Sequence, residues 1–256
     1  ADEVFDSRVK NPQDGTAEEI THIWASLFSL ENPVQCLILL RKLANQHLLT
    51  ILPNQISFLT SLYSDSYSQY DPELRNQASL LIFTLFSTNP KLIPLFDQAG
   101  LIQFAYQLFP LCNIPKFLYL YAYESYSCSK FLIANNFISK LVKLLSFDGS
   151  ISEDETDPFL FVDFDENFLN YILCAGSICD LTEYEEFLFP LGQALLSISI
   201  NTENDWKIRS ESIISYSNFL KQSEEACKQF LSTNSLSLLI VPDLINTNLA
   251  YNQFAC

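Results

Sequence analysis

The residues that could act as acids, bases or nucleophiles are sparse and scattered along this chain of 256 residues. There are two histidines, His22 and His47, and His47 lies in an apolar stretch. A general base needs a nucleophile and an orienting partner within reach, and the sequence indicates neither. Adjacent carboxylates such as Glu185 and Glu186 would need to face a second acid across a cleft to cleave a glycosidic bond. We therefore predict that the protein is not an enzyme.

Cofactor and metal chemistry also lacks its usual residue patterns. The five glycines are isolated, so no glycine-rich loop is present to hold a phosphate. The seven cysteines include no Cys-x-x-Cys pair, and with two histidines they do not reach the spacing of a zinc site. We expect no cofactor and no metal.

The chain is strongly acidic. It has 14 Lys and Arg against 30 Asp and Glu, a formal net charge of −16. This charge repels nucleic-acid phosphates and anionic lipid head groups. The longest uncharged run, residues 98–115, is broken by Pro110 and by polar residues, so it does not supply the roughly 20 apolar residues of a membrane span. We predict no nucleic-acid partner and no membrane span, and we expect any charged partner to be basic.

The compartment is predicted from the cysteines and the N-terminal residues. An odd number of cysteines inside apolar runs is typical of reduced core thiols. Residues 1–20 are polar and lack the apolar segment of a secretory signal. Both features favour a cytoplasmic or nuclear location.

The elements that must position any functional residue are predicted to be helices. Apolar residues recur at helical spacing, for example at Ala78, Leu81, Ile82 and Leu85. An Asn or Asp precedes a proline at Pro33, Pro72, Pro90 and Pro158, a pattern typical of a capped helix start. The pattern predicts an all-α fold of short helices that bury their apolar faces against one another.

One segment shows how these helices are grouped. Residues 72–109 read as a long apolar helix, an Asn89-Pro90 link, a short helix, Gly100 and a further helix. This order resembles the armadillo repeat family, with Thr84 in place of the Asn near the end of the third helix and Gly100 at the bend before the second. The resemblance implies a right-handed α-solenoid of about five armadillo-like repeats.

Weaker copies of the pattern flank this segment. Asn218 and Asn234 are sixteen residues apart, as are Thr84 and Gly100, and asparagine tolerates the left-handed backbone of a bend. The predicted bends are at Asn54, Gly100, Asn136, Leu191 or Gly192, and Asn234. Their uneven spacing leaves both the armadillo and the related HEAT family open.

The domain organisation follows from these repeats. We expect a lead-in and cap over residues 1–31, an armadillo-like domain over 32–243 and a tail over 244–256. Residues 147–166 lack helical periodicity and are predicted to form an acidic loop insertion. Fourteen acids and no Lys or Arg lie between Lys143 and Lys207, which indicates either a solubilising surface or a site that attracts a basic partner.

Candidate partner-binding residues follow from the resemblance and from a tyrosine cluster. Third helices line the peptide groove of armadillo proteins, and the register assigns the family's Trp positions to Leu80 and Ile214. If residues 116–125 form a third helix, Tyr119 and Tyr123 share one face, and Phe117 and Tyr121 lie on another. The candidate residues are Asn76, Thr84, Tyr119, Tyr123, Asp180, Ser210 and Asn218.

The function predicted from the sequence is that of a protein-interaction adaptor or scaffold. It would hold a protein or peptide partner on the concave face of the solenoid. More specifically, we expect the partner to place a basic segment near residues 148–186. The alternatives are a nucleotide-exchange cochaperone of an Hsp70, a structural subunit of a larger complex, and a helical hydrolase.

Overall fold

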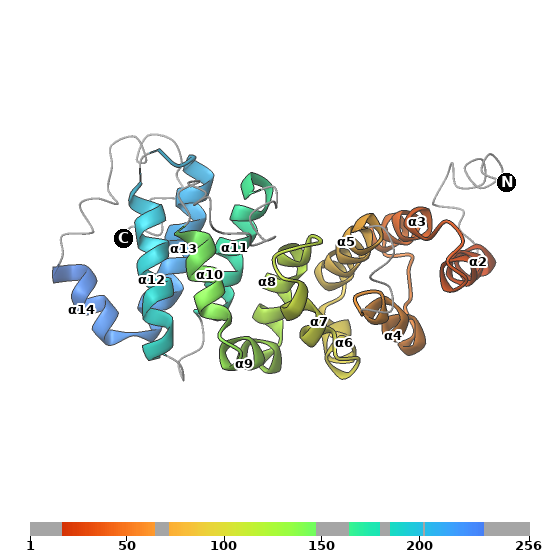
Figure 1. Cartoon of the computed structure of the whole chain (residues 1–256), viewed down its shortest axis with the longest axis horizontal. Coiled ribbons are helices and arrows are strands. Elements are labelled where there is room, and N and C mark those ends of the chain that lie inside the picture. The colour runs from red at the N-terminus through yellow and green to blue at the C-terminus, as the bar shows by residue number, and fades with distance from the viewer. Residues whose placement is uncertain (1–16, 65–71, 147–163, 180–184, 202, 233–256) are drawn as a thin grey trace, which may run out of the picture. The chain divides into compact units, whose positions relative to one another are not determined.

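The computed structural model describes residues 17–64, 72–146, 164–179, 185–201 and 203–232. Every regular element within these ranges is a helix (Figure 1). The chain divides into two compact units, residues 1–128 and 129–256. The all-α prediction is therefore confirmed for the described residues.

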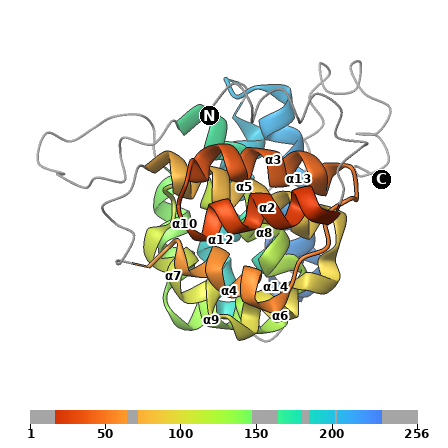
Figure 2. The same ribbon diagram turned by 90° about the vertical axis from the view of Figure 1, so that its right-hand side faces the viewer.

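Unit 1 is built around a row of three helices that pack side by side. α3 (Pro33–Asn45) packs on α5 (Pro72–Thr88), and α5 packs on α8 (Ile114–Glu124). α2 (Ala17–Phe28) packs beside α3, as Figure 2 shows, and buries Trp24 and Leu27. The shorter elements are α4 (Pro53–Ser61), the 3-10 helix η3 (Pro90–Leu92), α6 (Ile93–Gln98) and α7 (Leu101–Leu108). Helix α9 (Tyr126–Ala134) begins in unit 1 and ends in unit 2.

Prolines mark the described helix starts as predicted, but the two predicted capping residues that the structure describes, Asn32 and Asn89, do not cap with their side chains. Helical segments begin at Pro33, Pro72 and Pro90, because the fixed φ angle of proline suits the first helical turn. Asn32 has a left-handed backbone with φ 47°, and neither Asn32 nor Asn89 accepts a capping hydrogen bond with its side chain. The predicted start at Pro158 lies outside the described ranges.

Two of the predicted bends are confirmed and two are wrong. Gly100, with φ 78°, separates α6 from α7, and Asn136, with φ 61°, separates α9 from α10 (Phe137–Leu145). Asn54 lies inside the first turn of α4, so it is not a bend. Residues 191 and 192 lie inside one continuous helix, α12 (Glu185–Ile200). Asn234 lies outside the described residues.

Gly192 is needed for helix packing rather than for a bend. A Cβ atom at this position would lie 2.4 Å from the ring of Phe219 on α13 (Trp206–Gln222). Gly176 plays the same part on α11 (Phe164–Ile178), where a Cβ would lie 2.5 Å from the Oγ of Ser215. These glycines let α11 and α12 both pack closely on α13, which is the central helix of unit 2.

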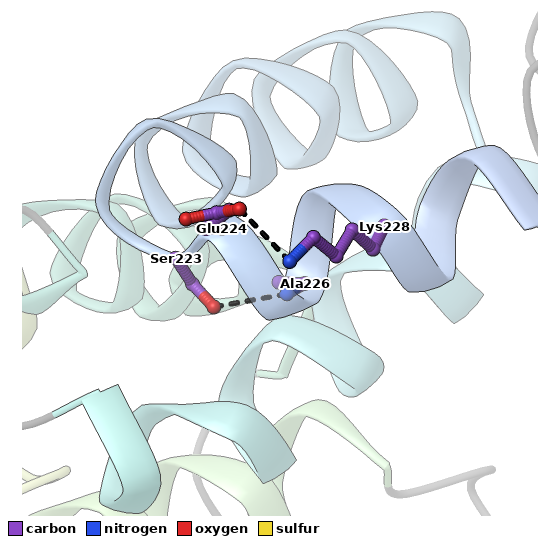
Figure 3. Close-up of polar contacts among 4 residues, drawn as sticks. All are labelled: Ser223, Glu224, Ala226 and Lys228. Atoms are coloured by element: carbon purple, nitrogen blue, oxygen red, sulfur yellow. Dashed lines mark hydrogen bonds and ion pairs between the residues drawn. The ribbon is translucent and has the colours of Figure 1, made fainter.

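Helix α14 (Glu224–Ser232) packs on α13 at the end of the described chain. The Oγ of Ser223 accepts a hydrogen bond from the Ala226 amide at 2.9 Å and caps the helix (Figure 3). Glu224 and Lys228 form an ion pair of 2.8 Å, but both side chains are exposed, so it adds little stability.

The described helices give no single membrane span. None of them is both long and apolar enough to cross a bilayer. α5 and the residues 90–98 that follow meet the length and composition requirements only as a pair, and they are bent by 114° relative to each other.

The predicted acidic insertion is described only at its end. Residues 147–163 lie outside the described ranges, and α11 begins at Phe164, inside the predicted loop. The predicted lead-in contains α2, and the predicted tail, residues 244–256, is not among the described residues.

Candidate partner-binding surface on helices α5 and α8

An aromatic contact joins α5 to α8. The ring centroids of Phe83 on α5 and Tyr119 on α8 are 6.3 Å apart, with the ring planes inclined at 50°. Both side chains are half-buried, so each packs against its neighbour and still reaches the surface. Phe83 was not among the residues predicted from the sequence, although it follows Asn76 by two helical turns and could have been found from that spacing.

The tyrosines of α8 divide between two faces, as their spacing predicts. Tyr123 is 64% exposed one turn beyond the half-buried Tyr119. Phe117 and Tyr121 are fully buried, and each packs against Phe86 of α5. Helix α8 therefore presents two tyrosines outward and uses its other aromatic residues to hold itself on α5.

Two predicted residues of α5 have different surroundings. The amide Nδ2 of Asn76 donates to the carboxylate of Glu73 at 3.3 Å, and Asn76 is half-buried. Thr84 is only 6% exposed, and its hydroxyl donates to the carbonyl of Leu80 in the same helix at 2.9 Å. Asn76 is therefore placed to contact a partner, whereas Thr84 offers little surface for contact.

The remaining predicted residues do not join this group. Ser210 and Asn218 are half-buried on α13 in unit 2, and the Nζ of Lys221 donates to the Oδ1 of Asn218 at 3.5 Å. Asp180 lies outside the described residues. The candidate surface in unit 1 therefore consists of Asn76, Phe83, Tyr119 and Tyr123, with Glu73 beside Asn76.

A cavity of about 250 Å³ lies at the C-terminal ends of α3 and α5, and its lining residues include no Asp, Glu, Lys or Arg. His47, with φ 58°, Thr88 and Asn89 line it together with leucines and isoleucine. The described part of the chain contains no group of three or more His, Cys, Asp or Glu side chains that could hold a metal ion.

Four cysteines among the described residues are suited to packing rather than to chemistry. Cys36, Cys128, Cys174 and Cys179 are buried thiols. Burial raises the pKa of Cys36 to about 11, so its reactive thiolate form is rare near neutral pH.

Comparison with known proteins gives a fold but no sequence relative. No protein-family model matches the sequence, and no curated protein matches it. The structure resembles an engineered protein at TM-score 0.68 and 15% identity, covering 93% of both chains. It also resembles a computationally designed armadillo repeat protein for modular peptide recognition, at TM-score 0.66 and 18% identity, over 95% of this chain and 96% of that one.

A further designed armadillo repeat protein, solved in complex with the peptide (KR)4, matches at TM-score 0.64 and 18% identity over 96% of both chains. At such low identities the likeness establishes the fold alone. The fold class is that of an all-α, armadillo-like solenoid, as predicted.

Proposed function

We propose that the protein is an interaction adaptor that binds an extended segment of a partner polypeptide across α5 and α8. The observation that carries this proposal is the Phe83–Tyr119 contact with the exposed Tyr123 beside it. Half-buried aromatic side chains are rigid, so they contribute contact area at a small entropic cost and are enriched among the residues that dominate binding energy.

The side-chain amide of Asn76, two helical turns before Phe83 on α5, supplies the polar part of the proposed recognition. The Asn76 amide can exchange its 3.3 Å contact with Glu73 for a hydrogen bond to a peptide carbonyl. Such contacts to a peptide backbone give affinity without requiring a particular sequence. Asn218 on α13 offers a second amide in unit 2, and we propose it as a separate contact.

The finer form of the proposal is a preference for a basic segment. Glu73 on α5 and the exposed Glu124 on α8 place carboxylates on the two helices of the proposed surface. Tyrosine rings also attract Lys and Arg side chains through cation–π contacts. The (KR)4 peptide bound by one designed neighbour supports this choice of probe.

The proposal can be tested by selecting peptides on the full chain from a random dodecapeptide phage library. Selected peptides are then measured by fluorescence anisotropy against the Tyr119→Ala and Tyr123→Ser variants. We expect each variant to weaken binding by about tenfold, the usual loss when a central interface aromatic is truncated.

Tyr106→Ala is the matched control, because Tyr106 is a half-buried tyrosine on α7 rather than on α5 or α8. Equal losses in the control and the two test variants would contradict the proposed surface. So would a selection that enriches no peptide.

Two of the alternative functions, the cochaperone and the structural subunit, are distinguished by separate measurements. We propose a binding role rather than catalysis, and a location in the cytoplasm or nucleus. Accelerated nucleotide release from an Hsp70 ATPase domain, unaffected by the α8 variants, would favour the cochaperone. Stable co-purification with one assembly, equally unaffected, would favour a structural subunit.

A further inference from the structure

The connection from α3 to α4 contains a short segment, residues 48–52, with the side-chain pattern of a β-strand. Leu48, Thr50 and Leu52 are exposed, whereas Leu49 is half-buried and Ile51 is buried. Alternation of exposed and buried side chains with a period of two is typical of a strand. Leu52 also has extended backbone angles, with φ −100° and ψ 156°. The segment is therefore shaped like a strand, although the described ranges contain no strand beside it.

The backbone groups in the middle of this segment have no partners. Among the described residues, neither the N–H nor the C=O group of residues 49–51 takes part in a hydrogen bond. The amides on either side are bonded, since Leu48 donates to the carbonyl of Leu43 at 3.0 Å and Leu52 donates to the Oε1 of Gln55 at 2.8 Å. Backbone groups in folded proteins are rarely left unpaired. Three successive unpaired residues in a strand-like segment form an open edge, to which another strand can add.

The cavity of about 250 Å³ lies against this edge. Residues 49–51 line it together with Leu85 and Thr88 of α5. Leu85 is buried, whereas Thr50 and Asn89 are exposed, so the cavity has an apolar part and opens to the surface at its polar residues. An apolar cavity of roughly 150 Å³ holds a benzene molecule, so this cavity has room for one phenyl ring.

The edge and the cavity together favour an extended polypeptide over the other possible occupants. Water could bond to the backbone groups singly, but it would leave Leu48 at 42% and Leu52 at 52% exposed. A small apolar ligand would fill the cavity without pairing three successive backbone groups. An added strand bonds to the backbone, covers the leucines with its own side chains and places one side chain in the cavity.

We propose that residues 48–52 bind an extended segment of a partner protein, which adds to this edge as a β-strand and inserts one phenylalanine ring into the cavity. An uncharged ring is favoured because no Asp, Glu, Lys or Arg lines the cavity. The site includes none of the residues of the surface proposed on α5 and α8, so the two proposals can fail separately.

The test measures the binding of uncharged peptides to the full chain by isothermal titration calorimetry. The probe is acetyl-Ser-Val-Thr-Phe-Thr-Val-Ser-amide. One comparison peptide has Ala in place of Phe, and the other carries N-methyl groups on its three central residues. We expect each comparison peptide to bind at least about tenfold more weakly, because the first leaves the cavity empty and the second loses its backbone donors. Equal affinities for the three peptides, or no binding of the probe, would refute the site.

Two matched variants locate the bound probe. Thr88→Phe places a ring in the cavity and should weaken probe binding at least about tenfold, whereas Ser87→Phe, at the exposed adjacent position outside the cavity, should not. Tyr123→Ser should also leave the affinity unchanged. A loss in Tyr123→Ser, or full affinity in Thr88→Phe, would mean that the probe binds elsewhere and would overturn the inference.

A second measurement uses the wild-type chain alone. Hydrogen exchange at the amides of residues 49–51, followed by NMR, should be fast in the free chain, because these amides are not hydrogen-bonded. A saturating concentration of the probe should slow it at least about tenfold, and the same concentration of the N-methylated peptide should not. Slow exchange in the free chain, or exchange that the probe leaves unchanged, contradicts the proposal.

Discussion

At the scale of single residues, the carboxylate of Asp97 organises the junction between α8 and α9. It accepts hydrogen bonds from the hydroxyls of Tyr121, Ser125 at 2.8 Å and Ser127 at 3.0 Å. The Ser125 hydroxyl also accepts from the Cys128 amide at 3.1 Å and so caps α9. One acid of α6 therefore fixes the end of the helix that carries Tyr119 and Tyr123.

The first prediction concerns this acid. Asp97→Ala should lower the free energy of unfolding by about 2–4 kcal/mol, because the buried Tyr121 hydroxyl loses its acceptor and hydrogen bonds to a charged group are strong. Urea denaturation measures the loss. Asp205→Ala is the control, since this exposed cap of α13 should cost only about 1 kcal/mol. Losses of the same size at both positions would mean that the Asp97 network adds nothing beyond a cap.

The second prediction concerns alkaline pH. Burial raises the pKa of Tyr63, whose hydroxyl shares a hydrogen bond of 2.8 Å with Ser79, and raises that of Tyr216 to about 12. An unfolded tyrosine ionises near pH ~10, so the stabilisation is complete below that pH and is lost as the pH rises above it. The free energy of unfolding should fall by about 1.4 kcal/mol per pH unit for each such group.

Tyr63→Phe isolates one of these contributions. Urea denaturation between pH 9 and pH 11.5 should show a shallower alkaline loss for the variant than for the wild type. Identical slopes would show that Tyr63 ionises with equal ease in the folded and unfolded chain.

At the scale of elements, the helices of unit 2 pack closely at positions where glycine has no side chain. Gly192 of α12 lies directly against the ring of Phe219, which is 1% exposed and cannot move aside. Gly176 of α11 meets Ser215, whose hydroxyl donates to the carbonyl of Ile172 at 3.2 Å. The approach of α11 and α12 to α13 thus depends on glycine at two positions.

The third prediction tests this close approach. Gly192→Ala should destabilise the chain by about 1–3 kcal/mol through overpacking, although alanine is the better helix former by about 1 kcal/mol. Adding Phe219→Leu should recover part of the loss by removing the obstructing ring. The measurement is urea denaturation, with Gln193→Ala on the exposed face of α12 as the neutral control. A stabilising Gly192→Ala would contradict the packing described here.

Gly100 differs from these two glycines, because a Cβ there would meet no atom within 4 Å. Only its positive φ angle of 78° disfavours another residue at this position. Gly100→Ala should cost about 1 kcal/mol, and Gly100→Asn should cost less, because asparagine adopts the left-handed backbone more readily. Asn136 holds the equivalent position before α10.

At the scale of the whole molecule, charge is distributed unevenly along the sequence. Fourteen of the thirty acids lie between Lys143 and Lys207, where no Lys or Arg occurs. A concentrated negative field speeds the arrival of a basic ligand, and salt screens it over about 8–10 Å. Under the proposed function, this charge would attract a basic segment, which the surface on α5 and α8 would then hold.

The fourth prediction follows for the probe peptide (KR)4. Its affinity for the full chain should fall steeply between 50 and 200 mM salt, and the fall should be reduced when Asp148, Glu153, Asp154, Glu155 and Asp157 are replaced by their amides. Fluorescence anisotropy measures both curves. A salt dependence that is unchanged by these replacements would exclude the acidic stretch from binding.

Features that depend on residues adjacent in the sequence were predictable from the sequence alone. Helical class, the helix starts at Pro33, Pro72 and Pro90, and the left-handed bends at Gly100 and Asn136 follow from periodicity and backbone preference. The two faces of α8 follow from the same spacing. Each of these depends on a few consecutive residues whose steric limits hold in any fold.

Features that depend on which helices meet were decided by the tertiary structure. The glycine at 192 is consistent with a bend or with a close contact, and only the position of Phe219 distinguishes them. The neighbour of Tyr119 and the burial of Thr84 likewise depend on residues far away in the chain. Local periodicity determines which face of a helix is apolar, but it does not determine the partner of that face, because many helices offer an equally apolar surface.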